Sequence, residues 1–150
     1  EDYAPFPYER EKLVFLKMDG RRLAFADGAF DIVYSLSSIE HFGGITGAVD
    51  AMDDMIRVLK PGGILVLATE YCLSGPPHHE AFQAEEVRRL LARPGARLVG
   101  PLDEGVHHRY EMAAVDLRKN PYQTPHMAVR DGDTVFTSVV AFLERTGAVE

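Results

Sequence analysis

The sequence predicts a single α/β domain built on a mostly parallel β-sheet with flanking helices. Three observations support this prediction: short apolar runs rich in strand-forming residues, amphipathic helical stripes between them, and Pro-Gly or Asp-Gly pairs at the boundaries. Alternation of strands and helices is typical of parallel sheets, because a crossover helix brings the chain back to the edge where the previous strand began. A length of 150 residues and a hydrophobic share of 46% fit one globular domain.

Three apolar runs are the expected parallel strands. They are residues 13–18 (LVFLKM), 32–34 (IVY) and 64–68 (ILVLA). Polar residues follow each run, namely Asp19, Ser35 and Thr69. The carboxyl ends of parallel strands lie at one edge of a sheet, where open α/β sheets bind ligands. We therefore expect the three carboxyl ends to face the same side.

Two helical stripes alternate with these strands. The first consists of Ala48, Met52, Met55, Ile56 and Leu59, which recur at spacings of three and four residues. Thr46 is its expected N-cap, and Pro61-Gly62-Gly63 is its expected end. The second stripe consists of Ala84, Val87, Leu90 and Leu91. Two further strands are expected, over residues 97–102 and residues 134–143.

Composition limits the kinds of partner. The net charge of −7 and the pI near 5.3 disfavour a nucleic-acid interface, because an acidic surface repels phosphate backbones. The single cysteine, Cys72, excludes an internal disulfide and is typical of a reducing compartment, so we expect a cytoplasmic protein. No apolar run approaches the 18 residues of a membrane span, so we expect no membrane partner.

Three phrases, in this order, resemble the class I S-adenosylmethionine-dependent methyltransferases of the methyltransferase type 11-like kind. They are residues 18–35 (MDGRRLAFADGAFDIVYS), residues 37–42 (SSIEHF) and residues 57–69 (RVLKPGGILVLAT). In that family the first holds a strand-ending acid and a Phe-Asp pair that opens the next strand. The second holds a Glu-His pair after the fourth strand, and the third a Pro-Gly-Gly turn before the fifth. The resemblance implies a Rossmann-like sheet and methyl transfer from S-adenosylmethionine to a small-molecule acceptor.

The resemblance also implies cofactor-binding residues. Asp19 would accept a hydrogen bond from the adenine amino group, with the amide of Gly20 facing the ring. Asp2 would bind the two ribose hydroxyls. The backbone that would line the methionine part of the cofactor belongs to Ser35, Leu36 and Ser37. For Asp19 the alternative is an ordinary Asp-Gly turn, and for the serines a plain strand end.

His41 is the candidate catalytic residue. In the resembling family the Glu-His pair often lies beneath the cofactor as a packing and hydrogen-bonding element, so a structural histidine is the alternative to a catalytic base. A base is needed only when the acceptor must lose a proton early, as a hydroxyl does. His107, His108 and Tyr110 are further candidates for that role, and the sequence does not choose among them.

Residues 105–130 have no clear period and carry aromatic, imidazole and proline side chains. A connection of this length in a compact domain is usually functional or disordered. In the resembling family, additions at such places often close over the acceptor. We therefore expect an acceptor-side cap here, with a solvated surface excursion as the alternative.

One part of the family pattern is missing. The family carries a glycine-rich cofactor loop after its first strand, and no such loop precedes residue 13; the glycine cluster at residues 43–47 is interpreted as a turn. We therefore expect residues 1–150 to be the carboxyl two-thirds of a longer domain. In the family's strand order, the two absent strands would leave a gap of roughly 10 Å between the third and fourth strands. Residues 1–150 alone are then expected to bind the cofactor weakly.

Other functions remain open at this point. A catalytically inactive methyltransferase-like interaction module is the main alternative, and a nicotinamide-dependent oxidoreductase is a third class. The pairs His78-His79 and His107-His108 could meet Asp103 or Glu104 at a metal ion, but we interpret them as solvated loop residues. Cys72 has no flanking base and is not expected to act as a nucleophile.

Overall fold

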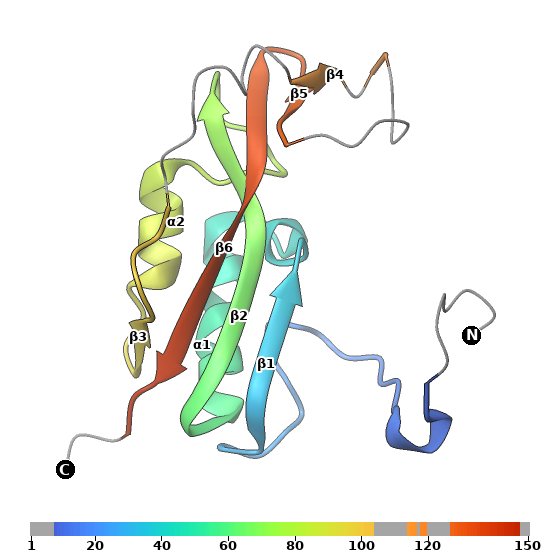
Figure 1. Ribbon diagram of the computed structural model, residues 1–150, viewed down its shortest axis with the longest axis vertical. Coiled ribbons are helices and arrows are strands. Elements are labelled where there is room, and N and C mark those ends of the chain that lie inside the picture. The colour runs from blue at the N-terminus through green and yellow to red at the C-terminus, as the bar shows by residue number, and fades with distance from the viewer. Residues whose placement is uncertain (1–7, 104–113, 117, 120–126, 148–150) are drawn as a thin grey trace.

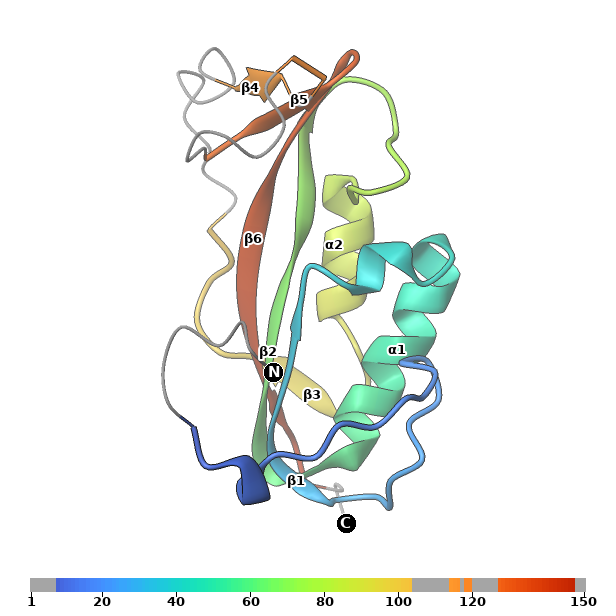
Figure 2. The ribbon, with the colours of Figure 1, turned by 90° about the vertical axis from the view of Figure 1, so that its right-hand side faces the viewer.

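The protein forms two layers, a β-sheet and a pair of helices on one of its faces (Figures 1 and 2). The computed structural model describes residues 8–103, 114–116, 118–119 and 127–147. The strands are β1 (Phe30–Leu36), β2 (Leu59–Ser74), β3 (Ala96–Leu98), β4 (Val115–Asp116), β5 (Val129–Asp131) and β6 (Thr134–Arg145). The helices are α1 (Gly44–Val58) and α2 (Ala84–Leu91), with two short 3-10 turns, η1 (Arg10–Lys12) and η2 (Ile39–His41).

The parallel pairing of the second and third predicted runs is confirmed. β1 pairs with β2 in parallel, with Ile32 opposite Ile64 and Leu36 opposite Ala68. β2 is longer than the predicted run, because its pairing continues on either side of it. The register shifts between Phe30 and Ile32, where β2 carries its Pro-Gly-Gly turn. Both strands therefore bring their carboxyl ends to the same edge of the sheet.

The sheet as a whole is mixed. Its order is β1-β2-β6-β5-β4, with β3 paired to β6. The long strand β6 runs antiparallel to β2, to β3 and to β5. A strand's residue pattern reports which faces are buried but not its direction, so alternation alone predicted more parallel pairing than the structure has. The α/β class and the last predicted strand are both confirmed.

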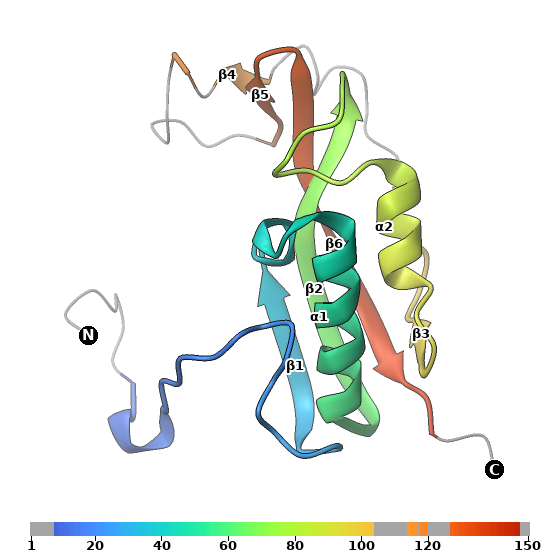
Figure 3. The same cartoon turned by 180° about the vertical axis from the view of Figure 1, so that it is seen from behind.

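Helices α1 and α2 lie side by side against one face of the sheet (Figures 2 and 3). The predicted α1 stripe is buried, with Ala48 and Met52 fully enclosed. It packs on Leu65 and Leu67 from β2 and on Leu143 from β6. Burial of these side chains on one face fixes the position of α1 relative to β1 and β2, and thus the position of the loop between them.

Helix α1 begins three residues earlier than an N-cap at Thr46 would allow. Its N-cap is Gly43, which has a left-handed conformation with φ of 95° and makes no side-chain capping bond. Glycine adopts that conformation without steric cost, so the turn interpretation of the glycine cluster holds while the Thr46 cap is wrong. Helix α2 matches its prediction and carries a capping box formed by Gln83 and Glu86.

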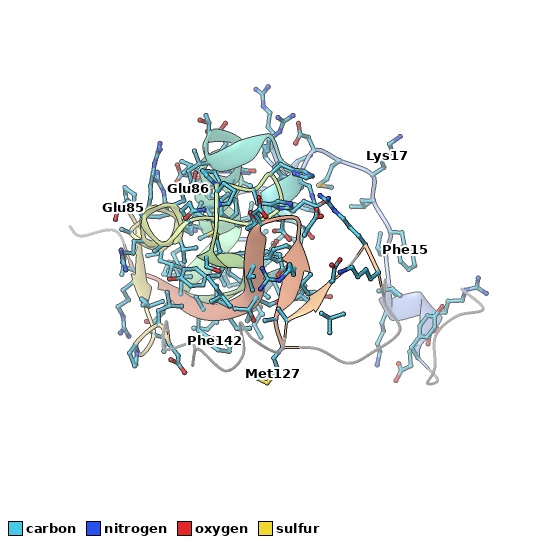
Figure 4. All side chains as sticks on the ribbon, turned by 90° about the horizontal axis from the view of Figure 1, so that it is seen from above. Phe15, Lys17, Glu85, Glu86, Met127 and Phe142 are labelled. Carbon is cyan, nitrogen blue, oxygen red and sulfur yellow. The ribbon has the colours of Figure 1, made fainter. Side chains whose placement is uncertain are left out.

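The prediction of a strand over residues 13–18 is wrong. These residues form no strand, and Val14 and Phe15 expose 74% and 76% of their surface. Figure 4 shows Phe15 and Lys17 on a segment that lies beside the sheet and outside it. A strand-forming composition is insufficient without a neighbouring strand to pair with, and no described residue pairs with this run.

The opposite face of the sheet is apolar and has no helix over it in the described part of the chain. Ile32, Tyr34 and Leu36 of β1 are 56–70% exposed on it, and Phe142 of β6 is 47% exposed. In the sheet formed by the described residues, β1 is also an edge strand with a neighbour on one side only. Among residues described by the structure, no helix is long and apolar enough to cross a membrane.

Candidate functional site

Two cavities open at the carboxyl ends of β1 and β2. The first, here called the Gly20 cavity, has a volume of about 370 Å³ and is lined by Gly20, Leu23, Val33, Tyr34, Ser35, Leu36, Ser38, Phe42 and Met55. The second, the Glu70 cavity, has a volume of about 570 Å³ and is lined by Ser37, Glu40, His41, Glu70, Glu80, Met127, Val129, Phe136, Thr137 and Ser138. The turn from Leu36 to Ser38 contributes to both, so the two cavities are neighbours.

The Gly20 cavity is mostly apolar and depends on a close approach between Gly20 and Phe42. A Cβ atom placed on Gly20 would lie 2.6 Å from Cζ and 2.7 Å from Cε2 of the Phe42 ring. Carbon atoms in contact are normally 3.5–4.0 Å apart. Glycine at this position therefore lets the ring form one wall of the cavity. The structure brings together three of the predicted cofactor residues here, namely Gly20, Ser35 and Leu36.

Asp19 lies beside this cavity, half exposed and paired with Arg21. Its carboxylate accepts bonds from the Arg21 backbone N–H and Nε, both 3.0 Å away, and from Nη2 at 2.8 Å. These hydrogen bonds, first of all the side-chain ones, lower the pKa of Asp19 to about 2. A carboxylate has about four acceptor positions. Because its pKa is low, Asp19 is ionised at neutral pH. Arg21 fills three of the acceptor positions, so the carboxylate can accept one more hydrogen bond.

Arg57 holds the segment after Gly20 against α1. Its Nε donates to Asp54 at 2.7 Å, Nη2 donates to the Leu23 carbonyl at 2.9 Å, and Nη1 donates to the Phe25 carbonyl at 2.8 Å. Asp54 in turn accepts the Leu23 N–H. A guanidinium offers five donors in a rigid plane, so one side chain can hold several backbone carbonyls in place. This arrangement positions Gly20 and Leu23 at the cavity.

Ser37 has a strained backbone at the end of β1. Its φ is +42°, and it is the one non-glycine residue with positive φ in the described ranges. Its N–H donates to the Ala68 carbonyl at 2.9 Å, which extends the pairing of β1 with β2 by one bond. Such strain is found disproportionately at functional sites and persists when the surroundings over-determine it. The strained turn directs the Ser37 side chain into the Glu70 cavity.

Glu70 is held by two serines from two different strands. Ser37 Oγ donates to Oε1 at 3.1 Å, while Ser138 Oγ lies 3.0 Å from Oε1 and 3.2 Å from Oε2. Glu70 and Ser138 are cross-strand partners on β2 and β6. The sequence analysis did not single out Glu70 as a site residue, although its place directly after a buried strand was a signal. Ser138 could be found only from the register of β6.

Glu40 is a buried carboxylic acid in the wall of the same cavity. It is 3% exposed, and its Oε2 accepts a hydrogen bond from Thr69 Oγ1 at 2.9 Å. Its Oε1 has no hydrogen-bond partner among the residues that the structure describes. Desolvation raises the pKa of Glu40, and the charge of Glu70 raises it further. Sequence reasoning grouped Glu40 with His41 as a pair, but it did not predict that the glutamate would be the buried member.

The other predicted site residues differ in what the structure shows of them. His41 is exposed and lines the Glu70 cavity. Asp2 lies outside the described residues, and so do His107, His108 and Tyr110 of the expected cap. Of residues 105–130, Met127 and Val129 are described at the Glu70 cavity.

The expectation of a solvated loop residue is wrong for His78, whose side chain is 11% exposed and stacks on Phe136, whereas the His79 side chain is 79% exposed. The Nδ1 atom of His78 accepts the Glu80 N–H at 3.2 Å, so the proton of the neutral ring is on Nε2, which lies 3.3 Å from Asp131. Arg118 also binds Asp131, at 2.6 Å, and together these two partners lower the pKa of Asp131. Within the described ranges, no three His, Cys, Asp or Glu side chains are grouped so that they could hold a metal ion. Cys72 is buried in a small cluster with Phe136.

Comparison with known proteins identifies the family of this chain. A family model described as a methyltransferase domain matches residues 4–67, which include Asp19, β1 and most of β2. The chain belongs to the class I S-adenosylmethionine-dependent methyltransferases. Membership agrees with the order of the three phrases that the sequence shares with that family.

Curated relatives extend this match. A ubiquinone/menaquinone biosynthesis C-methyltransferase from Roseobacter denitrificans is 30% identical over 124 residues, covering 81% of this chain and 45% of the relative. The 27-O-demethylrifamycin SV methyltransferase from Amycolatopsis mediterranei is 33% identical over 101 residues, covering 67% and 35%. The sterol 24-C-methyltransferase from Schizosaccharomyces pombe is 35% identical over 82 residues, covering 51% and 21%. The chain thus spans less than half the length of these relatives.

Solved structures share the fold. The 4+2 cyclase SpnF superposes with a TM-score of 0.60 at 16% identity, over 91% of this chain and 57% of that one. A putative methyltransferase from Bacillus halodurans superposes with a TM-score of 0.54 at 16% identity, over 88% and 71%. At this level of identity the likeness establishes the Rossmann-like methyltransferase fold.

Proposed function

We propose that the protein transfers the methyl group of S-adenosylmethionine to a small-molecule acceptor. The observation that carries the proposal is the placement of two cavities on either side of one turn. Leu36 and Ser38 line the Gly20 cavity, while Ser37 between them lines the Glu70 cavity. A cofactor in the first and an acceptor in the second would approach each other across a single residue.

The residues of the Gly20 cavity fit the adenine end of the cofactor. The cavity is apolar, as a purine ring requires, and the ionised Asp19 at its margin is an acceptor for an exocyclic amino group. In this proposal the Gly20 amide faces the ring, and the backbone of Ser35, Leu36 and Ser37 lines the methionine part. Asp2 is proposed to bind the ribose.

The protein's contribution to the chemistry is orientation. When bound, the cofactor supplies a sulfonium methyl group that is already activated. Holding an acceptor in line with that carbon can supply roughly 7–11 kcal/mol of the barrier. In this proposal the Ser37 turn separates the cofactor from the acceptor, and the hydrogen bond from the Ser37 N–H to the Ala68 carbonyl holds the turn against β2. His41 at the rim of the Glu70 cavity is the proposed base for an acceptor that must lose a proton.

Residues 105–130 are proposed as the cap on the acceptor. Met127 and Val129, near its end, line the Glu70 cavity, which supports a location over that ligand. Replacing His108 and Tyr110 by alanine is then expected to change acceptor turnover and leave cofactor affinity unchanged. Unaltered acceptor kinetics in both variants would contradict the cap.

The test of the proposed function is made on the full-length protein. Calorimetry with S-adenosylhomocysteine is expected to give one site, and a panel of acceptors with methyl-labelled S-adenosylmethionine is expected to give a labelled product. Binding of S-adenosylhomocysteine with no transfer to any acceptor would favour the alternative of an inactive interaction module. Absence of binding would refute the proposal.

A further inference from the structure

Acidic side chains dominate the described lining of the Glu70 cavity, in which His41 is the one basic residue. Three glutamates line it, namely Glu40, Glu70 and Glu80, and neither lysine nor arginine joins them there. Met127, Val129 and Phe136 form an apolar wall of the same cavity. We infer that this cavity takes a small molecule that carries a cationic nitrogen on an apolar body. The inference rests on the proposed function, because it names the chemical class of the acceptor.

Glu70 is fixed in place but its charge is not balanced by the groups that hold it. The donors from Ser37 and Ser138 are neutral hydroxyls, which orient the carboxylate and leave its full negative charge in the cavity. Each hydroxyl has a single proton to donate. With two protons shared among about four acceptor positions, Glu70 can accept two more bonds. A protonated amine is a donor without acceptors, so it matches that remaining capacity.

Glu40 is an independent observation that points to a ligand. Its side chain is 97% buried, and Oε1 has no partner in the described part of the chain, while Oε2 is bonded to Thr69. Leaving a buried acceptor unbonded is unfavourable, and more so for a charged group. Glu70 repels it across the same cavity. A cation between the two carboxylates would relieve the repulsion and supply the missing donor.

Other ligand classes fit less well. An anion would meet three carboxylates and is opposed by charge. A divalent metal would need three or more ligands grouped around one point, and the described residues hold no such group. A neutral alcohol could bond to Glu70 but would leave its negative charge without a cationic partner. The contrast between an amine and an alcohol of the same shape is therefore the decisive comparison.

The experiment uses three probes of matched size on the full-length protein at pH 7 without cofactor: 2-phenylethylamine, 2-phenylethanol and 3-phenylpropionate. Calorimetry is expected to show the amine binding at least tenfold more tightly than the alcohol, with the carboxylate weakest. Glu70→Gln keeps the shape and the serine bonds, and it is expected to reduce the preference for the amine at least fivefold. Glu80→Gln, at the partly exposed rim, is expected to reduce it by a smaller factor.

The matched control is Glu85→Gln on α2, an exposed glutamate far from Met127 (Figure 4), which is expected to leave the preference unchanged. Equal binding of amine and alcohol, no binding of the amine, or a preference that survives Glu70→Gln would each overturn the inference. This experiment measures binding of the probes, and methyl transfer is measured in the separate assay of the proposed function, so the two proposals can fail independently. Preference for the amine without any transfer would refute the proposed function alone, and transfer to an alcohol with no preference would refute this inference alone.

Discussion

Replacement of Gly20 by alanine is expected to disturb the Gly20 cavity by steric conflict with Phe42. Gly20 does not have a positive φ, so the alanine backbone is allowed and the conflict is between side chains. The new Cβ would lie 2.6 Å from the ring, about 1 Å closer than an ordinary carbon contact. Overpacking of this kind costs about 1–3 kcal/mol. Against it stands a gain of about 0.4–1 kcal/mol, because alanine has fewer unfolded conformations than glycine. The net expected loss of unfolding free energy is about 1 kcal/mol.

A double-mutant cycle separates the two contributions. Phe42→Leu removes the ring atoms that conflict with the new methyl group, so Gly20→Ala in that background is expected to be neutral or slightly stabilising. The coupling free energy from urea denaturation of the four proteins is then about 1–2 kcal/mol. The unfolded-state contribution cancels, because it is the same in both backgrounds. Gly20→Ala is also expected to weaken binding of S-adenosylhomocysteine, since the displaced ring narrows the cavity. Equal stability loss in both backgrounds would refute the steric argument.

Three further variants test other parts of the site. Asp19→Ala in the full-length protein is expected to weaken S-adenosylhomocysteine binding by about 1.5–3 kcal/mol, the range for a hydrogen bond to a charged group, while the melting temperature stays close to the original; unchanged affinity would show that Asp19 does not contact the cofactor. Glu40→Gln is expected to change how stability depends on pH. Burial raises the pKa of Glu40 in the folded state above its ordinary value of 4.5. The contribution of Glu40 to the unfolding free energy is therefore lost as the pH rises from 4.5 through the raised pKa, and the glutamine variant lacks this loss. Parallel curves of unfolding free energy against pH for the two proteins between pH 4 and pH 8 would contradict this. Arg57→Met is expected to lower the unfolding free energy by about 2–3 kcal/mol in urea denaturation, because Asp54 and two carbonyls lose a charged donor; a loss below about 0.5 kcal/mol would show that the segment after Gly20 is held by other contacts.

The sequence predicted the elements that are buried on both sides or on one amphipathic face. The run at 64–68 is a buried strand, and the two apolar stripes are the buried faces of α1 and α2, although Leu59 at the end of the first stripe already belongs to β2. The run at 32–34 is also a strand, but Ile32 and Tyr34 are exposed on it, and it is held by its pairing with β2. The run at 13–18 has the same composition but no paired neighbour in the described structure, and it is not a strand. Composition alone does not distinguish the two situations, since pairing is a property of the sheet.

Site residues that lie at the ends of predicted strands could be predicted from the sequence, whereas a site residue that depends on the register of β6 could not. Gly20, Ser35 and Leu36 were expected from strand ends and from the resemblance, and they line one cavity. The contact of Ser138 with Glu70 requires that β6 run antiparallel to β2 in one particular register. Nothing local to Ser138 records that register, because a shift of two residues would preserve the same pattern of buried faces.

The pairing of β2 with β6 has a consequence for how the chain folds. Ile64 pairs with Glu144 and Ser74 with Val135, so the partners are separated by 61 to 80 residues in sequence. The contacts of β1, α1 and β2 are far more local, and loop closure makes local contacts faster to form. We expect β1, α1 and β2 to assemble first, as a unit in which the side of β2 that later pairs with β6 is still open. During synthesis the edge of β2 would then wait, unpaired, until β6 has left the ribosome. That interval is when this chain is most exposed to aggregation, and a chaperone would have its clearest opportunity to act there.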